Sequence, residues 1–106
     1  MKQKRNMEKI IAENVKRICK MQRKQLKDLS IEIGMDPASL NRAIHGNPRL
    51  DTIEKIAIAL GVSVKSLFEP TTDETIEGYI KTRGKIFQFN CKEELYQILT
   101  LNNIKL

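Results

Sequence analysis

Hydrophobic residues recur every three or four positions over the first two thirds of the chain, which is the spacing of one helical face. This pattern predicts a first helix over residues 7–21, with lysines and arginines on its other faces. After the basic joint Gln-Arg-Lys-Gln it predicts a short second helix over residues 26–33. Gly34 suits the C-terminal cap of that helix because glycine adopts positive φ without strain.

The third helix has the clearest start in the chain. Asp36 offers an N-cap carboxylate, and Pro37 suits the first helical position because the N–H there has no helical partner. Leu40 and Ile44 fall on the inward stripe, and the run His-Gly-Asn-Pro at residues 45–48 ends the helix.

Two further helices follow. Residues 51–54, Asp-Thr-Ile-Glu, predict a capping box at the start of a fourth helix, which runs to Gly61. Ser63 can cap a short fifth helix that ends near Phe68. Residues 7–68 therefore predict an all-α bundle of five short helices.

The hydrophobic period changes to two beyond a polar connector at residues 69–74. Residues 75–90 predict a β-hairpin around a turn at Arg83 and Gly84. Asn90 can cap a last helix, with Glu93 three residues on, so the expected class is α+β. A two-residue turn sets a register that makes one sheet face apolar and pairs Thr82 with Lys85, Ile80 with Phe87, Gly78 with Phe89 and Ile76 with Cys91.

A hairpin with one helix is marginal in water and has free edges, so residues 75–106 need a packing partner. They either pack on the helical bundle or pair with a second copy of the chain. We favour self-pairing into a homodimer, because residues 69–106 lack a basic excess. The expected dimerisation residues are Ile76, Ile80, Phe87 and Phe89.

The net charge of +6 is unevenly placed along the 106 residues. Residues 1–68 hold 14 Lys and Arg against 7 Asp and Glu, a balance of +7, whereas residues 69–106 hold 5 against 6, a balance of −1. A basic excess favours a polyanionic partner through counterion release. The basic bundle is therefore the region expected to meet nucleic acid.

Several other classes of protein are disfavoured. No apolar run is long enough to span a membrane or to form a signal peptide, which favours a cytoplasmic protein. Cys19 and Cys91 have no neighbours at metal-ligand spacing, which favours reduced thiols. We expect no metal, no cofactor and no enzymatic activity, because the chain lacks a phosphate loop, a paired-carboxylate pattern and a metal cluster.

Two short helices joined by Gly-Met-Asp, the second strongly capped, predict a helix-turn-helix. The joint spacing of Gly34, Leu40 and Gly46, the run LNRAIHGNP and the later TIEKIAIALGVSVKSLF resemble the phage-repressor (Cro/cI-like, or xenobiotic-response-element) helix-turn-helix family. The resemblance covers residues 8–68. It implies a lambda-repressor-like five-helix domain that binds double-stranded operator DNA as a dimer, with the start of the third helix at base edges.

Carried over by position, the resemblance implies base-reading roles for Pro37, Ala38, Asn41 and Arg42. Family members often have glutamine where this chain has Pro37 and Ala38, so readout here should depend more on Arg42 and Asn41. Another family glutamine, which binds phosphate, is replaced here by Leu26, and the expected contact shifts to Gln25 or Lys27.

Arg42 is the favoured specificity residue on chemical grounds as well. A guanidinium can hold guanine O6 and N7 with two hydrogen bonds, worth about 1–3 kcal/mol of discrimination. Lys24 lies in the basic joint and either contacts phosphate or is solvated. The full set of expected phosphate-contacting residues is Lys24, Gln25, Lys27, Ser39, His45, Asn47 and Arg49.

The N-terminal residues 1–6, MKQKRN, are expected to form a flexible tail. The alternative is a basic arm that reaches into the minor groove. Both interpretations leave the bundle to begin at Met7.

The leading hypothesis is a sequence-specific transcriptional repressor that binds a two-fold symmetric operator as a homodimer. An alternative from another class is an antitoxin-like interaction module, whose C-terminal residues neutralise a protein partner while the bundle autoregulates. Copurification of a second chain with residues 69–106 would favour the alternative.

Overall fold

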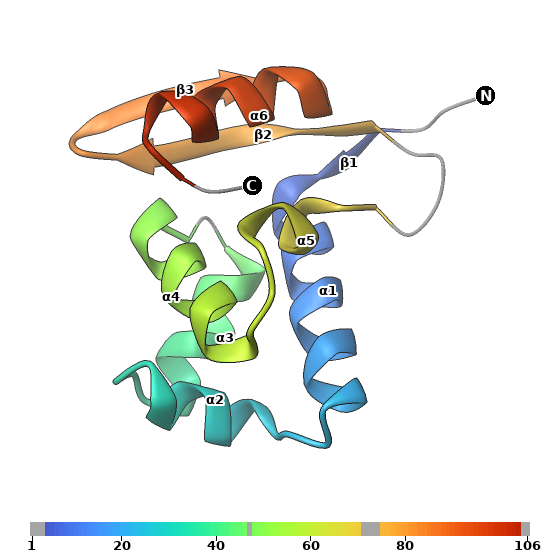
Figure 1. Cartoon of the computed structure of the whole chain (residues 1–106), viewed down its shortest axis with the longest axis vertical. Helices are drawn as coiled ribbons and strands as arrows, with labels where there is room; N and C mark the ends of the chain where they lie inside the picture. Colours follow the sequence, from blue (N-terminus) through green and yellow to red (C-terminus); the bar gives the residue numbers. More distant parts are fainter. Residues whose placement is uncertain (1–3, 47, 71–74, 105–106) are drawn as a thin grey trace.

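The structure is a computed structural model that describes residues 4–46, 48–70 and 75–104. A helical bundle is covered at one end by a small sheet and a last helix, and α2 lies at the opposite end (Figure 1). The elements in chain order are β1 (Lys4–Asn6), α1 (Met7–Met21), α2 (Leu26–Glu32), α3 (Pro37–His45), α4 (Leu50–Leu60), α5 (Val64–Phe68), β2 (Thr75–Thr82), β3 (Lys85–Phe89) and α6 (Lys92–Leu101).

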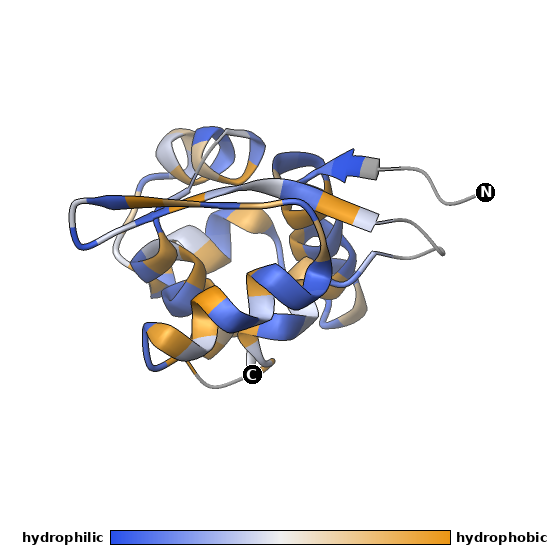
Figure 2. Cartoon of the chain, turned by 90° about the horizontal axis from the view of Figure 1, so that it is seen from above, coloured by the Kyte–Doolittle hydropathy of each residue, from blue (hydrophilic) through white to orange (hydrophobic). Residues whose placement is uncertain are grey.

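The mixed α+β class and the five-helix bundle are confirmed. Hydrophobic and hydrophilic residues alternate along the helices (Figure 2), as the sequence spacing requires. Gly34 and Gly61 follow α2 and α4 with φ of 75° and 69°, a backbone that glycine adopts without strain. Every helix of the bundle contributes to the buried centre, where the fully buried side chains include Ile11, Leu29, Leu40, Ile53 and Leu67.

Two predicted helix starts are wrong by one residue or more. α4 begins at Leu50, with Arg49 as its N-cap, so the expected capping box at residues 51–54 does not form. Instead Asp51 accepts a hydrogen bond from the adjacent Thr52 N–H at 3.0 Å. The helix therefore begins two residues earlier than predicted, with the side chain of Leu50 buried at 1 % exposure.

At α6 the N-cap is Cys91, not Asn90. The Asn90 N–H donates to the carboxylate of Glu94 at 2.9 Å, so Glu94 takes the place that the sequence suggested for Glu93. Ser63, by contrast, caps α5 as predicted and accepts from the Ser66 N–H at 3.2 Å.

Residues 4–6, expected to belong to a flexible arm, form strand β1 parallel to the start of β2. Asn6 lies opposite Glu77 in this pairing. The Arg5 guanidinium also forms an ion pair and hydrogen bond with Glu13 of α1. The beginning of the described chain is therefore bound to both the sheet and the bundle, while residues 1–3 lie outside the described residues.

The hairpin has the predicted register, with Thr82 opposite Lys85, Ile80 opposite Phe87 and Gly78 opposite Phe89. The turn residues Arg83 and Gly84 have φ of 51° and 75°. Two consecutive left-handed residues match the right-handed twist of the strands. The predicted pairing of Ile76 with Cys91 lies beyond the residues that pair in β3.

The apolar hairpin face packs on its own chain, the alternative that we did not favour. Ile76, Ile80 and Phe89 are at most 1 % exposed and belong to the same core as the bundle, and Phe87 packs against that core partly buried. A β-carbon added to Gly78 would lie 2.9 Å from Met7 Cβ and 3.3 Å from Phe89 Cζ. Gly78 therefore leaves room for the aromatic ring, as predicted, and also lets β2 approach α1.

Cys19 is buried and Cys91 is half-buried, and both are free thiols. Burial raises the pKa of the Cys19 thiol. No helix in the described residues has the length and apolar content needed to cross a membrane.

Candidate nucleic-acid interface

The side chain of Asp36 sets the start of α3. Its carboxylate accepts hydrogen bonds from the Ser39 backbone N–H at 3.2 Å and from the Ser39 hydroxyl at 2.5 Å. These bonds hold the pKa of Asp36 below its usual range, and the hydroxyl contributes most. Pro37 follows at the start of the helix. Local contacts alone therefore fix where α3 begins, as its sequence predicts.

The predicted base-reading residues all lie exposed on α3: Pro37, Ala38, Asn41 and Arg42. The inward face of the same helix holds Leu40 and Ile44, both at 0 % exposure. The Arg42 guanidinium donates to the Ser39 hydroxyl at 3.3 Å, which directs it back toward the helix start. Helix α3 thus presents guanidinium and amide groups of the kind that hydrogen-bond base edges.

Three of the predicted phosphate-contacting residues make only local hydrogen bonds in the part of the chain that the structure describes. Gln25 is the N-cap of α2, and its backbone N–H donates to Asp28 at 3.0 Å. Lys27 is exposed on the first turn of α2. Ser39 is half-buried, and its hydroxyl is already shared between Asp36 and Arg42.

Two other predicted phosphate contacts are ion-paired within the chain. Lys24 lies 2.9 Å from the Glu32 carboxylate and 3.5 Å from the carbonyl oxygen of Ala59. Arg49 lies 3.5 Å from the Asp51 carboxylate and remains largely exposed. A further predicted contact, Asn47, lies outside the described residues.

The structure also brings to this surface Lys16 of α1, a residue that sequence reasoning missed. It lies next to the predicted phosphate-contacting residue His45, on the last turn of α3, whose ring is linked to the backbone of Asn41 and to the Lys16 ammonium. The spacing of α1 shows only that Lys16 lies off the buried stripe. A contact across 29 positions has no local signal in the sequence.

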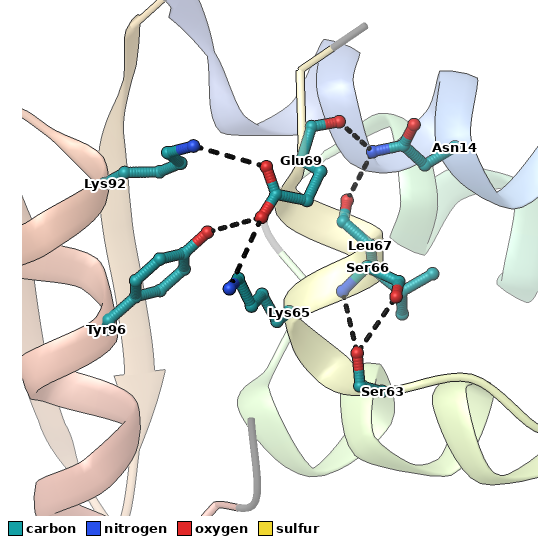
Figure 3. Close-up of polar contacts among 8 residues, drawn as sticks. All are labelled: Asn14, Ser63, Lys65, Ser66, Leu67, Glu69, Lys92 and Tyr96. Atoms are coloured by element: carbon teal, nitrogen blue, oxygen red, sulfur yellow. Dashed lines mark hydrogen bonds and ion pairs between the residues drawn. The ribbon is translucent and has the colours of Figure 1, made fainter.

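A polar joint holds the C-terminal unit, defined here as β2, β3 and α6, against the bundle (Figure 3). Asn14 of α1 is 1 % exposed and donates to the carbonyl oxygens of Leu67 and Glu69, each at 2.9 Å. The Glu69 carboxylate accepts from two residues of α6, Lys92 at 3.3 Å and Tyr96 at 2.8 Å. The connection after α5 is thereby fastened to α1 on one side and to α6 on the other.

Two further features complete the joint. Lys65 of α5 lies 4.0 Å from the Glu69 carboxylate and 5.3 Å from the centre of the Tyr96 ring. Burial, and then the hydrogen bond to Glu69, raise the pKa of the Tyr96 phenol, so the phenol remains a donor well above neutral pH.

No cluster of three or more His, Cys, Asp or Glu side chains that could hold a metal ion occurs in the described ranges. The sequence of residues 14–73, more than half of the chain, matches the family model of the Cro/C1-type HTH DNA-binding domain. Neither the curated proteins nor the solved structures compared with this chain provide a match. The matched segment contains most of α1 and all of α2, α3, α4 and α5, including the capped and exposed helix α3. The chain therefore belongs to the Cro/C1-type helix-turn-helix family of DNA-binding transcriptional regulators.

Proposed function

We propose that the protein is a sequence-specific repressor that places α3 in the major groove of a two-fold symmetric operator. The exposed face of α3 is the observation that carries this proposal, because it combines a rigid start with Asn41 and Arg42 directed away from the core. Occupancy of the operator would then block polymerase. No separate sensor is needed for this mechanism.

Within this proposal Arg42 reads base identity and Lys27 contacts the DNA backbone. Arg42 can hold guanine through two hydrogen bonds, and loss of such a pair lowers the discrimination against other bases by about 1–3 kcal/mol. Lys27 is an exposed lysine on the first turn of α2, and a point charge on phosphate carries no sequence information. Mutation of Arg42 should therefore change base preference, and mutation of Lys27 should change affinity for all sequences.

We propose further that the protein acts as a homodimer joined along the outer edge of β3. The sheet order β1-β2-β3 leaves that edge without a neighbouring strand in the described part of the chain. Because Thr82 and Lys85 flank a two-residue turn, the backbone groups of Ile86 and Gln88 point away from β2. Ile86 is 65 % exposed on this strand, and an open strand edge is a template for pairing.

The first experiment is selection of bound duplexes from a random DNA library by the purified protein at near-physiological salt. An enriched inverted repeat, with half-sites about one helical turn apart, roughly 34–36 Å, is the expected result. Absence of any enrichment by the folded protein would contradict sequence-specific readout. A second chain that copurifies through the C-terminal unit would then favour the antitoxin-like alternative.

Variants separate the roles within the selected site. Arg42→Ala should relax base preference at one position per half-site and leave binding to random DNA nearly unchanged. Lys27→Ala should weaken binding to all sequences and make the salt dependence shallower by about one unit. Equal losses on operator and random DNA in both variants would contradict the division into base-reading and backbone-contacting residues.

The dimer is tested by mass in solution. Ile86→Lys should give a monomer in light scattering, because it adds charge at the proposed edge without disturbing the core. Leu101→Lys is the matched control, since Leu101 is 75 % exposed on α6. A monomer from the control variant alone would place the contact on α6 instead.

A further inference from the structure

His45 connects the recognition helix to α1 through both nitrogens of its ring. Nδ1 lies 2.8 Å from the carbonyl oxygen of Asn41, one turn earlier in α3. Nε2 lies 3.1 Å from Nζ of Lys16, on α1. The ring therefore spans from the backbone of a predicted base-reading residue to a cation on a neighbouring helix.

The two partners indicate which nitrogen of the ring donates and which accepts. A carbonyl oxygen can only accept a hydrogen bond, so Nδ1 of His45 carries the proton and donates to Asn41. An ammonium group can only donate, so Nε2 accepts from Lys16. The Nδ1–H tautomer of the ring satisfies both contacts.

The charge of Lys16 is not neutralised by a carboxylate within the described residues. Some other cations are ion-paired, as Arg5 is with Glu13 and Lys24 is with Glu32. Lys16 has the imidazole of His45 as its contact, is exposed, and stands beside the last turn of α3. Its full positive charge is thus held at one end of the recognition helix.

We propose that Lys16 contacts the DNA sugar-phosphate backbone and that His45 is the positioning residue that holds it there. This inference rests on the proposed function, because it requires α3 to lie in the major groove. A groove is bordered by two phosphate backbones, so a cation fixed at the end of an inserted helix faces one of them. His45 thereby couples the docking of α1 to the placement of Asn41.

Removal of the charge tests the backbone contact. Lys16→Ala should weaken binding about fivefold at 0.15 M salt for operator and random duplexes alike, and make the slope of log K against log salt shallower by about 0.9, the value for one phosphate. The control is Lys9→Ala, which removes the same charge from an exposed position two turns earlier on α1. The control should change the slope much less.

Changes at the ring test the positioning role. His45→Ala should lower affinity no more than Lys16→Ala does, and the double variant should be no weaker than Lys16→Ala alone, since the two residues act as a unit. His45→Gln should retain most of the affinity, because its amide oxygen can still accept from Lys16. Denaturant unfolding of each variant is measured alongside binding.

The outcomes separate the two proposals. If Arg42→Ala changes base preference but Lys16→Ala has the same salt slope as Lys9→Ala, the inference about Lys16 is overturned and the proposed function stands. A loss of folding stability in Lys16→Ala with an unchanged slope also overturns it, because the contact would then only join α1 to α3. A wild-type protein that binds no DNA overturns both proposals.

Discussion

The polar groups on the exposed face of α3 point to solvent, whereas those between the C-terminal unit and the bundle are paired with one another. On α3 the Arg42 guanidinium has only the Ser39 hydroxyl as a described hydrogen-bond partner and remains exposed. At the joint, the Glu69 carboxylate is shared by residues of α5 and α6. The face proposed to bind DNA leaves its donors exposed, whereas the joint pairs its charged groups within the chain.

Apolar packing follows the same division. α3 buries one stripe and leaves the opposite face to solvent. The hairpin places Ile76, Ile80 and Phe89 in the same core as residues of the bundle and α6. Mutations in the first region should therefore change recognition, and mutations in the second should change stability.

The largest expected effect is that of Phe89→Ala. Phe89 is 1 % exposed, and loss of a buried phenylalanine side chain costs about 3–5 kcal/mol in the free energy of unfolding. Urea unfolding measures this loss, with Arg42→Ala as the control that should leave stability within about 0.5 kcal/mol. If Arg42→Ala were equally destabilising, the two regions would not be separable in this way.

Gly78→Ala should cause the next largest loss of stability. The added methyl group would lie 2.9 Å from Met7 Cβ, which forces β2 away from α1 and costs about 1–3 kcal/mol by overpacking. Thermal unfolding gives the size of the effect. Gly34→Ala is no suitable control because its φ is 75°, whereas Gln88→Ala changes an exposed position of the same hairpin. A stable Gly78→Ala variant would show that the sheet can move away from the bundle at little cost.

Tyr96→Phe should have a smaller effect. It removes the hydroxyl that donates to Glu69 at 2.8 Å and leaves the ring in place, with an expected loss of about 1 kcal/mol. The salt dependence of DNA binding should not change, since the joint has its charges paired internally. A changed slope would mean that the joint faces DNA.

The smallest expected effect is a dependence on acid pH through Glu13. The hydrogen bond from Arg5 lowers the pKa of Glu13 below its usual 4.5 in the folded chain. The stabilisation is therefore present above the unfolded-state pKa and is lost as pH falls through the lower folded-state value. Unfolding free energies of the wild type and Glu13→Gln should converge in strong acid and differ slightly at neutral pH. A gap that widens on acidification would reverse the sign and contradict this role for Arg5.

Local signals made α3 predictable from the sequence. The same region also allowed the family of the chain to be recognised. Asp36 and Pro37 act on the helix that directly follows them, so no distant residue is needed to place its start. At α4 the same reasoning was wrong, because burial of Leu50 outweighed the cap-like residues after it. The predictable parts are those in which neighbouring residues decide the structure.

Contacts between distant positions account for what the sequence did not predict. β1 pairs residues near position 5 with residues near position 76, and no pattern within a short window contains that information. The alternation in β2 and β3 predicted an apolar face and its register, but not which surface covers it. The link between Lys16 and His45 was missed for the same reason, since it depends on how α1 and α3 cross.

The close approach of Gly78 to Met7 and Phe89 has a consequence for the order in which the chain is made. Synthesis proceeds from the N-terminus, so α1 leaves the ribosome long before β2 and β3 exist. Met7, which is 1 % exposed in the finished molecule, therefore lacks its contact with Gly78 while the helices of the bundle are already made. β2 and β3 close over the start of α1 only after the helices of the bundle have been made, so this part of the core is the later part to form.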